Sequence, residues 1–128
     1  MKKPTILCVD DDRITLSFLK NALSDNYNVV VTNNSDQAFE LIVRLHPDLL
    51  ITDIVMAEMS GFELADLIKQ VKGREKMPVI VLSSYDEEQM LEKFNQSGLS
   101  LFFKKPVTIE VLNSGIQQLL NTQPIADH

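Results

Sequence analysis

Five short apolar runs alternate with amphipathic segments along the chain. Each run is mostly continuous rather than alternating and is rich in Val, Ile, Leu or Phe, which is typical of strands covered on both faces, as in a parallel sheet. We predict strands at TILCVD (5–10), NVVVTN (28–33), DLLITD (48–53), PVIVLSS (78–84) and SLFFKK (100–105).

The segments between these runs place apolar residues three or four positions apart, which predicts helices. The expected helices cover residues 13–24, 35–46 and 61–72, a more polar stretch from 86 to Gly98, and 109–120. In the first of them, the predicted apolar stripe consists of Ile14, Phe18, Leu19, Ala22 and Leu23. The expected N-caps are Ser35, Ser60 and Asp86, and "LHP" and "QSG" suit helix ends.

A strand followed by a helix, repeated five times, predicts an open α/β sheet of parallel strands with helices on both faces. The chain has 128 residues, 45% hydrophobic and 23% charged, which suits one globular domain. A net charge of −6 argues against a nucleic-acid-binding surface. No apolar run is long enough for a signal peptide or a membrane span, and the single cysteine, Cys8, fits a reducing cytosol.

Ligands bind such sheets at the carboxyl ends of the strands, where this sequence places complementary polar groups. The groups are Asp10, Asp11 and Asp12 after the first strand, Asp53 at the end of the third, Ser83 and Ser84 at the end of the fourth, and Lys104 and Lys105 at the end of the fifth. Clustered carboxylates repel one another unless a cation sits among them, and oxygen ligands favour Mg²⁺. A divalent ion beside a lysine and a hydroxyl makes a site for phosphoryl oxygens. Taken singly, Asp12 is expected to cap a helix and Cys8 to be a small core residue.

The segments "ILCVDDD", "PDLLITDIVMAEMSG", "MPVIVLSS" and "LFFKKP" resemble the receiver domain of bacterial two-component response regulators. The resemblance extends from residue 4 to about 121, with family-like spacings of 42, 30 and 22 residues between Asp11, Asp53, Ser83 and Lys105. It implies a flavodoxin-like, doubly wound (βα)5 fold with strand order 2-1-3-4-5. The receiver domain would span residues 1–121, with residues 122–128 as a tail or linker.

The resemblance also implies roles for individual residues. Asp53 would accept a phosphoryl group from a sensor histidine kinase or a histidine phosphotransfer protein. Asp11, Asp53 and the backbone carbonyl of Val55 would bind Mg²⁺, with Asp10 acting mainly through a metal-bound water. Ser83 and Lys105 would each bind a phosphoryl oxygen.

Phe102 stands where the family has its aromatic switch residue. By the same resemblance, the face formed by the helix expected from residue 86 to Gly98, the strand at 100–105 and the helix at 109–120 would signal to a downstream output protein or domain. A cytoplasmic monomer or weak dimer is expected, with no direct contact to nucleic acid or membrane. Three residues depart from the family pattern. Ala57 replaces the usual proline, so the loop after Asp53 is expected to be less rigid. Ser84 replaces a smaller residue, which is expected to alter phosphorylation and hydrolysis rates, and Phe102 lacks the hydroxyl of tyrosine, so a switch there would form no hydrogen bond.

Two alternatives remain at this point. Asp10 and Asp12 fit the D-x-D motif of haloacid-dehalogenase-type phosphatases, but residue 14 is Ile and the late acidic metal motif is missing. A receiver that works without phosphorylation, as a pure interaction module, would commonly have lost one of Asp11, Asp53, Ser83 and Lys105, all of which are present. The sequence therefore favours a phosphoacceptor that is not an enzyme acting on other substrates.

Overall fold

The computed structural model describes residues 3–54, 60–73, 76–84 and 100–121, and within them a five-stranded parallel sheet. The strand order is β2-β1-β3-β4-β5, as the family resemblance implied. The strands are β1 (Thr5–Val9), β2 (Asn28–Thr32), β3 (Leu49–Asp53), β4 (Val79–Ser83) and β5 (Leu101–Lys104). All five predicted strands are confirmed, each within one residue at either end.

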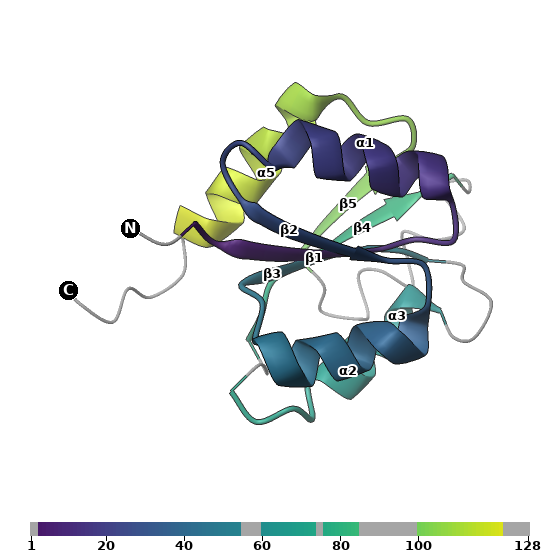
Figure 1. Cartoon of the computed structure of the whole chain (residues 1–128), viewed down its shortest axis with the longest axis vertical. Coiled ribbons are helices and arrows are strands. Elements are labelled where there is room, and N and C mark those ends of the chain that lie inside the picture. Colours follow the sequence, from purple (N-terminus) through teal and green to yellow (C-terminus); the bar gives the residue numbers. More distant parts are fainter. Residues whose placement is uncertain (1–2, 55–59, 74–75, 85–99, 122–128) are drawn as a thin grey trace.

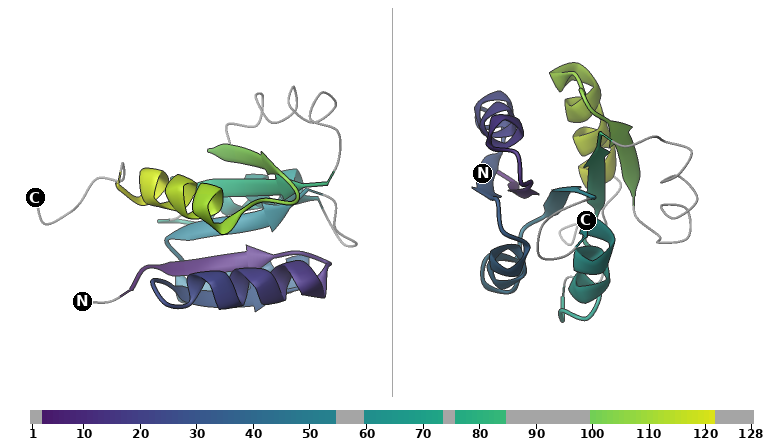
Figure 2. Two further views of the ribbon diagram at one scale, coloured as in Figure 1. Left: turned by 90° about the horizontal axis from the view of Figure 1, so that it is seen from above. Right: turned by 90° about the vertical axis from the view of Figure 1, so that its right-hand side faces the viewer.

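Helices cover both faces of this sheet (Figure 1). Helices α1 (Arg13–Leu23) and α5 (Ile109–Asn121) lie on one face, and α2 (Ser35–Leu45) and α3 (Gly61–Ile68) lie on the other. The two views in Figure 2 show the resulting three layers. The flavodoxin-like α/β prediction is therefore confirmed, while the helix expected from residue 86 and the tail at 122–128 lie outside the described residues.

The central strand β1 explains why its sequence is continuously apolar. Ile6 and Cys8 pack in the layer with α1 and α5, whereas Leu7 and Val9 pack in the layer with α2 and α3. All four side chains are at most 1% exposed, so both faces of the strand are covered from Ile6 to Val9. Burial raises the pKa of the Cys8 thiol to about 12, which agrees with the expected role as a small core residue.

The helix ends follow the predicted capping chemistry with one correction. Asp12 caps α1 by accepting the N–H of Ile14 at 3.0 Å, and Ser60 caps α3 in a capping box with Glu63. The N-cap of α2 is Asn34 rather than Ser35, because the Asn34 Oδ1 accepts the N–H of Gln37 at 2.9 Å.

The predicted apolar stripe of α1 is partly wrong. Ile14 is 80% exposed and Phe18 is 39% exposed, whereas Leu16, Leu19 and Leu23 face the sheet. Two stripes with helical spacing exist on this helix, and contact with the sheet selects the one that contains three leucines. The helix expected over 61–72 is also shorter, because α3 ends at Ile68 with Lys69 as its C-cap.

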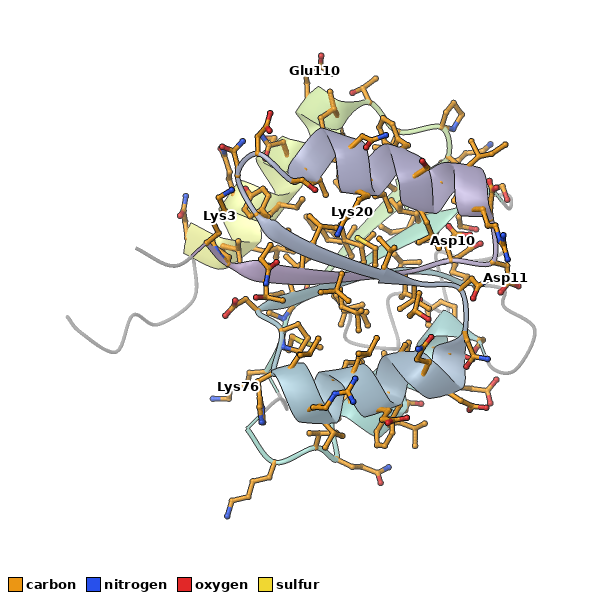
Figure 3. All side chains as sticks on the ribbon, viewed as in Figure 1. Lys3, Asp10, Asp11, Lys20, Lys76 and Glu110 are labelled. Atoms are coloured by element: carbon orange, nitrogen blue, oxygen red, sulfur yellow. The ribbon has the colours of Figure 1, made fainter. Side chains whose placement is uncertain are left out.

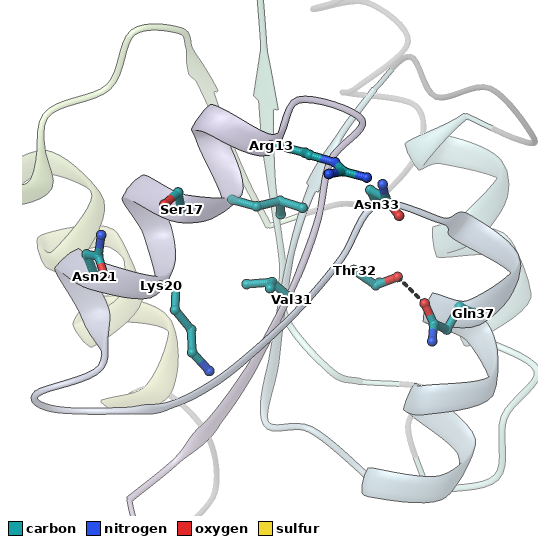
Figure 4. A pocket seen from close by; sticks show the side chains of 9 residues that line it. Arg13, Ser17, Lys20, Asn21, Val31, Thr32, Asn33 and Gln37 are labelled. Atoms are coloured by element: carbon teal, nitrogen blue, oxygen red, sulfur yellow. Dashed lines mark hydrogen bonds between the residues drawn. The ribbon is translucent and has the colours of Figure 1, made fainter.

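One side chain closes part of the open edge of the sheet at β2. Lys20 on α1 donates from its ammonium to the backbone carbonyl of Val29 at 2.6 Å. Beside it lies a hollow of about 470 Å³ between α1 and the end of β2, where Thr32 donates to Gln37 Oε1 at 2.6 Å (Figure 4). Of the predicted site residues that the structure describes, none lines this hollow.

Candidate functional site

The carboxyl ends of the strands bring the predicted polar residues to one rim of the sheet. Figure 3 shows Asp10 and Asp11 at the opposite end of β1 from Lys3. Asp53 and Ser83 are the last residues of β3 and β4, and Lys105 follows β5 directly. The backbone N–H of Lys105 donates to the Ser83 carbonyl at 2.7 Å, and the Lys105–Pro106 peptide bond is cis. The convergence expected from the strand-end rule is therefore present for these residues.

At the centre of the rim, the Lys105 ammonium lies between two carboxylates. Its Nζ is 2.7 Å from Asp10 Oδ2 and 3.4 Å from Asp53 Oδ2. The second oxygen of each carboxylate accepts a backbone N–H: Asp10 Oδ1 from Asp12 at 2.9 Å, and Asp53 Oδ1 from Ile54 at 2.7 Å. One cation and two backbone amides therefore hold two neighbouring negative charges.

The charges of the rim shift the pKa values of its members. Burial raises the pKa of Asp53, the negative charge of Asp10 raises it further, and the charge of Lys105 opposes both. Burial acts to lower the pKa of Lys105, but its hydrogen bond and charge pairing with Asp10, together with the charge of Asp53, outweigh that effect and raise it. Lys105 is thus held as a cation, and Asp53 is a carboxylate whose charged form is disfavoured by its surroundings.

The two carboxylates differ in their access to solvent. The Asp10 side chain is 2% exposed and the Asp53 side chain is 13% exposed. A hollow of about 560 Å³ opens beside Lys105 and is partly apolar, with the exposed Ile14 and Phe18 at its margin. Its lining also includes Ser84, which is exposed next to the end of β4.

The remaining predicted residues take different positions. Ser83 is fully buried, and Phe102 in β5 is half-buried and packs against the layer that contains α2 and α3. Asp11 is exposed at the start of the β1–α1 connection. Val55 and Ala57 lie outside the described residues.

The predicted Mg²⁺ site depends on the acidic side chains of this rim. Among residues 3–54, 60–73, 76–84 and 100–121, no three His, Cys, Asp or Glu side chains converge in a geometry that would hold a metal ion. The chemistry of the rim nevertheless fits a hard cation, because its acceptors are carboxylate oxygens and the negative charge of Asp10 disfavours ionisation of Asp53. Of the predicted side-chain ligands, Asp10 and Asp53 lie together beside Lys105, and Asp11 lies exposed in the β1–α1 connection.

Two contacts at Asp53 were not anticipated from the sequence. The Thr52 hydroxyl donates to the Asp53 carbonyl at 2.9 Å, and the backbone of Gly61 lies directly against that same carbonyl. The sequence held one signal for the second contact: a glycine, a poor helix former, directly after the N-cap Ser60.

Comparisons with known proteins show the family to which the chain belongs. The model of the response regulator receiver domain matches residues 6–117. The chain is 31% identical over 121 residues to response regulator MprA of Mycobacterium leprae, which covers 93% of this chain and 52% of that protein. It is 29% identical over 125 residues to sensor histidine kinase TmoS of Ectopseudomonas mendocina, which covers 98% of this chain and only 13% of the kinase.

The fold has close structural counterparts as well. The chemotaxis protein CheY4 of Vibrio cholerae superposes with a TM-score of 0.86 over 92% of this chain and 99% of that one, at 22% sequence identity. Within the part of the chain that the structure describes, no helix combines the length and the apolar character needed to cross a bilayer. The family match, the strand order and the rim of acids and lysine agree, and the chain belongs to the response regulator receiver domain family of two-component signalling.

Proposed function

We propose that Asp53 is the phosphoacceptor of this receiver domain. A carboxylate oxygen of Asp53 attacks the phosphorus of a phosphohistidine on a sensor histidine kinase or phosphotransfer protein. The P–N bond breaks, its electrons return to the imidazole, and an acyl phosphate forms on Asp53. The protein is thus a phosphoacceptor that assists transfer to itself and later dephosphorylation, not an enzyme acting on another substrate.

The observation that carries this proposal is the position of the Lys105 ammonium between Asp10 and Asp53. Phosphoryl transfer depends mainly on positioning and on neutralising the charge of the phosphoryl oxygens. At 3.4 Å from Asp53 and with a raised pKa, Lys105 is a fixed cation next to the attacking carboxylate. Ser83, buried at the end of β4, is the proposed hydroxyl donor to another phosphoryl oxygen.

The same geometry favours Asp53 over Asp10 as the nucleophile. Asp10 is almost completely buried, and it pairs with the Lys105 ammonium at the shorter distance of 2.7 Å. Asp53 is more accessible, and its contact with Lys105 is the longer of the two. The dehalogenase-type alternative requires attack by Asp10, so this arrangement argues against it.

Mg²⁺ is the cofactor that we propose for this rim. Asp11 and Asp53, with the backbone carbonyl of Val55, would hold the ion, and Asp10 would bind one of its waters. When bound, the ion supplies positive charge that neutralises phosphoryl oxygens. The carboxylates orient it, and Lys105 remains the protein's own cation at the site.

The proposed output is a shift between two packings of one face. Phe102 is half-buried in β5, two residues before the end of the strand and three before Lys105. A phosphoryl group at Asp53 would draw the Ser83 hydroxyl inward and let the Phe102 ring follow. The face expected to consist of residues 86–98, β5 and α5 would present this change to an output protein or domain, with residues 1–121 as the receiver unit and 122–128 as a tail or linker.

The proposal is tested with Mg²⁺ and acetyl phosphate, a small phosphodonor, by intact mass. We expect one phosphoryl adduct that disappears with EDTA and is absent from Asp53→Asn. Asp66→Asn, an exposed acid on α3, is the matched control and should keep the adduct. Absence of both the adduct and Mg²⁺ binding in the wild-type protein would contradict the proposal and favour an interaction module that works without phosphorylation.

A further inference from the structure

The backbone behind Asp53 is enclosed more tightly than the rest of the rim. A Cβ atom built on Gly61 would lie 2.3 Å from the carbonyl oxygen of Asp53, closer than atoms of the protein interior can approach. It would also lie 3.2 Å from the Asp53 carbonyl carbon and 3.2 Å from Thr52 Cγ2. The φ of Gly61 is outside the left-handed region, so the site demands glycine for space and not for backbone conformation.

Hydrogen bonds from several directions hold the segment of residues 52–54 in place. The Gly61 N–H donates to the Ile54 carbonyl at 2.7 Å, and the Thr52 hydroxyl donates to the Asp53 carbonyl at 2.9 Å. The Ile54 N–H in turn donates to Asp53 Oδ1 at 2.7 Å. Thr52 is fully buried and Ile54 is 3% exposed, so water does not compete for these bonds.

The start of α3 cannot yield easily to relieve a larger residue at position 61. Ser60 Oγ accepts the Glu63 N–H at 3.1 Å, and Glu63 Oε1 accepts the Ser60 N–H at 3.2 Å. Phe62 and Leu64, the residues around this turn, are buried in the layer shared with α2. A displacement caused at Gly61 is therefore transmitted to Asp53 rather than absorbed by the helix.

We propose that Gly61 and Thr52 are positioning residues that set the place of the Asp53 carboxylate. The absence of a side chain at Gly61 leaves room for the Asp53 peptide, and the Thr52 hydroxyl binds its carbonyl. As a result, Asp53 Oδ1 accepts from the Ile54 amide and Oδ2 faces Lys105. The expected effect on the phosphorylation rate rests on the proposed role of Asp53 as phosphoacceptor. The expected effect on the hydrogen bond from the Ile54 amide to Asp53 is independent of that role.

The test compares Gly61→Ala with Gly115→Ala. A Cβ at Gly115 would meet side-chain atoms of Leu101 and Phe103 at 3.0 Å, so this control crowds the opposite face of the sheet and leaves Asp53 untouched. We expect both variants to lower the melting temperature. Only Gly61→Ala should slow phosphorylation by acetyl phosphate, by about 100-fold, because transfer is sensitive to displacements of an ångström.

Thr52→Val and Thr52→Ser separate the hydroxyl from the shape of the side chain and provide a test that does not depend on Gly61→Ala folding. Thr52→Val should slow phosphorylation about fivefold through the loss of one buried hydrogen bond. Thr52→Ser retains the hydroxyl and its hydrogen bond, so the activation barrier for phosphorylation should hardly change. Its rate should remain within about twofold of the wild-type rate.

The second readout is the Ile54 amide signal in ¹H–¹⁵N NMR spectra, recorded without any phosphodonor. This amide reports its hydrogen bond to Asp53 Oδ1. We expect its chemical shift to change in Gly61→Ala and Thr52→Val but not in Gly115→Ala.

The inference is wrong if Gly61→Ala and Thr52→Val leave both the Ile54 signal and the phosphorylation rate as in the wild type. A wild-type protein that takes up no phosphoryl group, together with a shifted Ile54 signal in Gly61→Ala, would overturn the proposed function alone and support the positioning role. Equal changes in Gly61→Ala and Gly115→Ala would also overturn the inference, because they would reflect general destabilisation.

Discussion

The ends of β1 and β3 carry the same residue type in two different settings. Asp10, directly after β1, is sealed from solvent and is held by Lys105 at 2.7 Å and by the Asp12 amide at 2.9 Å. Asp53, at the end of β3, is more accessible, and its contact with Lys105 is 3.4 Å. Burial and the neighbouring Asp10 disfavour its charge. Asp10 is therefore the closely held counterion of the lysine, whereas Asp53 is the more accessible and less closely paired of the two acids.

The largest expected effect comes from removing the cation that both ends share. Lys105→Met leaves the nearly inaccessible Asp10 without its ammonium partner and should lower the free energy of unfolding by about 3 kcal/mol. Urea denaturation measures this loss. Lys104→Met, at the exposed neighbouring position, should change it by less than about 0.5 kcal/mol. Equal effects at the two lysines would mean that the rim does not depend on this pairing.

The next effect distinguishes Asp10 as a structural counterion. Asp10→Asn keeps the shape but weakens a charge-assisted hydrogen bond, so we expect a loss of about 2 kcal/mol in the free energy of unfolding. Asp25→Asn, in the exposed α1–β2 turn, serves as the control in the same denaturation experiment. An Asp10→Asn variant as stable as wild type would remove the basis for treating the two strand ends as different.

A smaller loss of stability is expected from removing the N-cap of α3, the helix that begins against the end of β3. Ser60→Ala removes the cap of α3, which holds Gly61 against Asp53, and should cost about 1 kcal/mol. Ser114→Ala on the exposed side of α5 is the matched control, and thermal unfolding compares the two. No difference between these variants would indicate that α3 holds its position without the capping box.

The smallest expected effect is a gain in stability rather than a loss, and it depends on pH. Because the pKa of Asp53 is raised in the folded protein, its ionisation destabilises the fold as pH rises from the ordinary carboxyl range through the folded pKa. Asp53→Asn should therefore be more stable than wild type at neutral pH. The two should converge below about pH 4, where the unfolded carboxyl is also protonated. Melting temperatures across pH check this, and a destabilised Asp53→Asn variant at neutral pH would contradict it.

Most of the fold could be predicted because the signals are local. Continuous apolar runs gave the strands, and Asp12 and Ser60 behave as the caps that their residue types indicate. The errors arose where tertiary packing chooses between local options. Asn34 and Ser35 are both good caps, but it is Asn34 that accepts the Gln37 N–H, whereas Ser35 is the first residue of α2 and is buried. The exposure of Ile14 likewise depends on how α1 rotates against the sheet.

The site could be predicted only in part, for a related reason. The rule that parallel strands share a carboxyl end brings Asp10, Asp53 and Lys105 together. It does not say which acid the lysine approaches more closely, since that depends on the path of the chain from Ser83 to Lys105. The contact of Gly61 with Asp53 joins residues that are eight positions apart in the chain, and no periodicity encodes such an approach.

The bond from Lys20 to the Val29 carbonyl also affects how molecules of this protein meet one another. The backbone groups of Asn28 and Thr32 face β1 and pair with it. Backbone groups point to alternate sides along a strand, so the N–H and carbonyl of Val29 face the open edge of the sheet. An exposed strand edge is a template for pairing with a strand of another molecule, and lysine is among the residues that suppress it. Because the Lys20 ammonium already occupies this carbonyl, an incoming strand must first displace a charge-assisted bond. This disfavours edge-to-edge aggregation in concentrated solution.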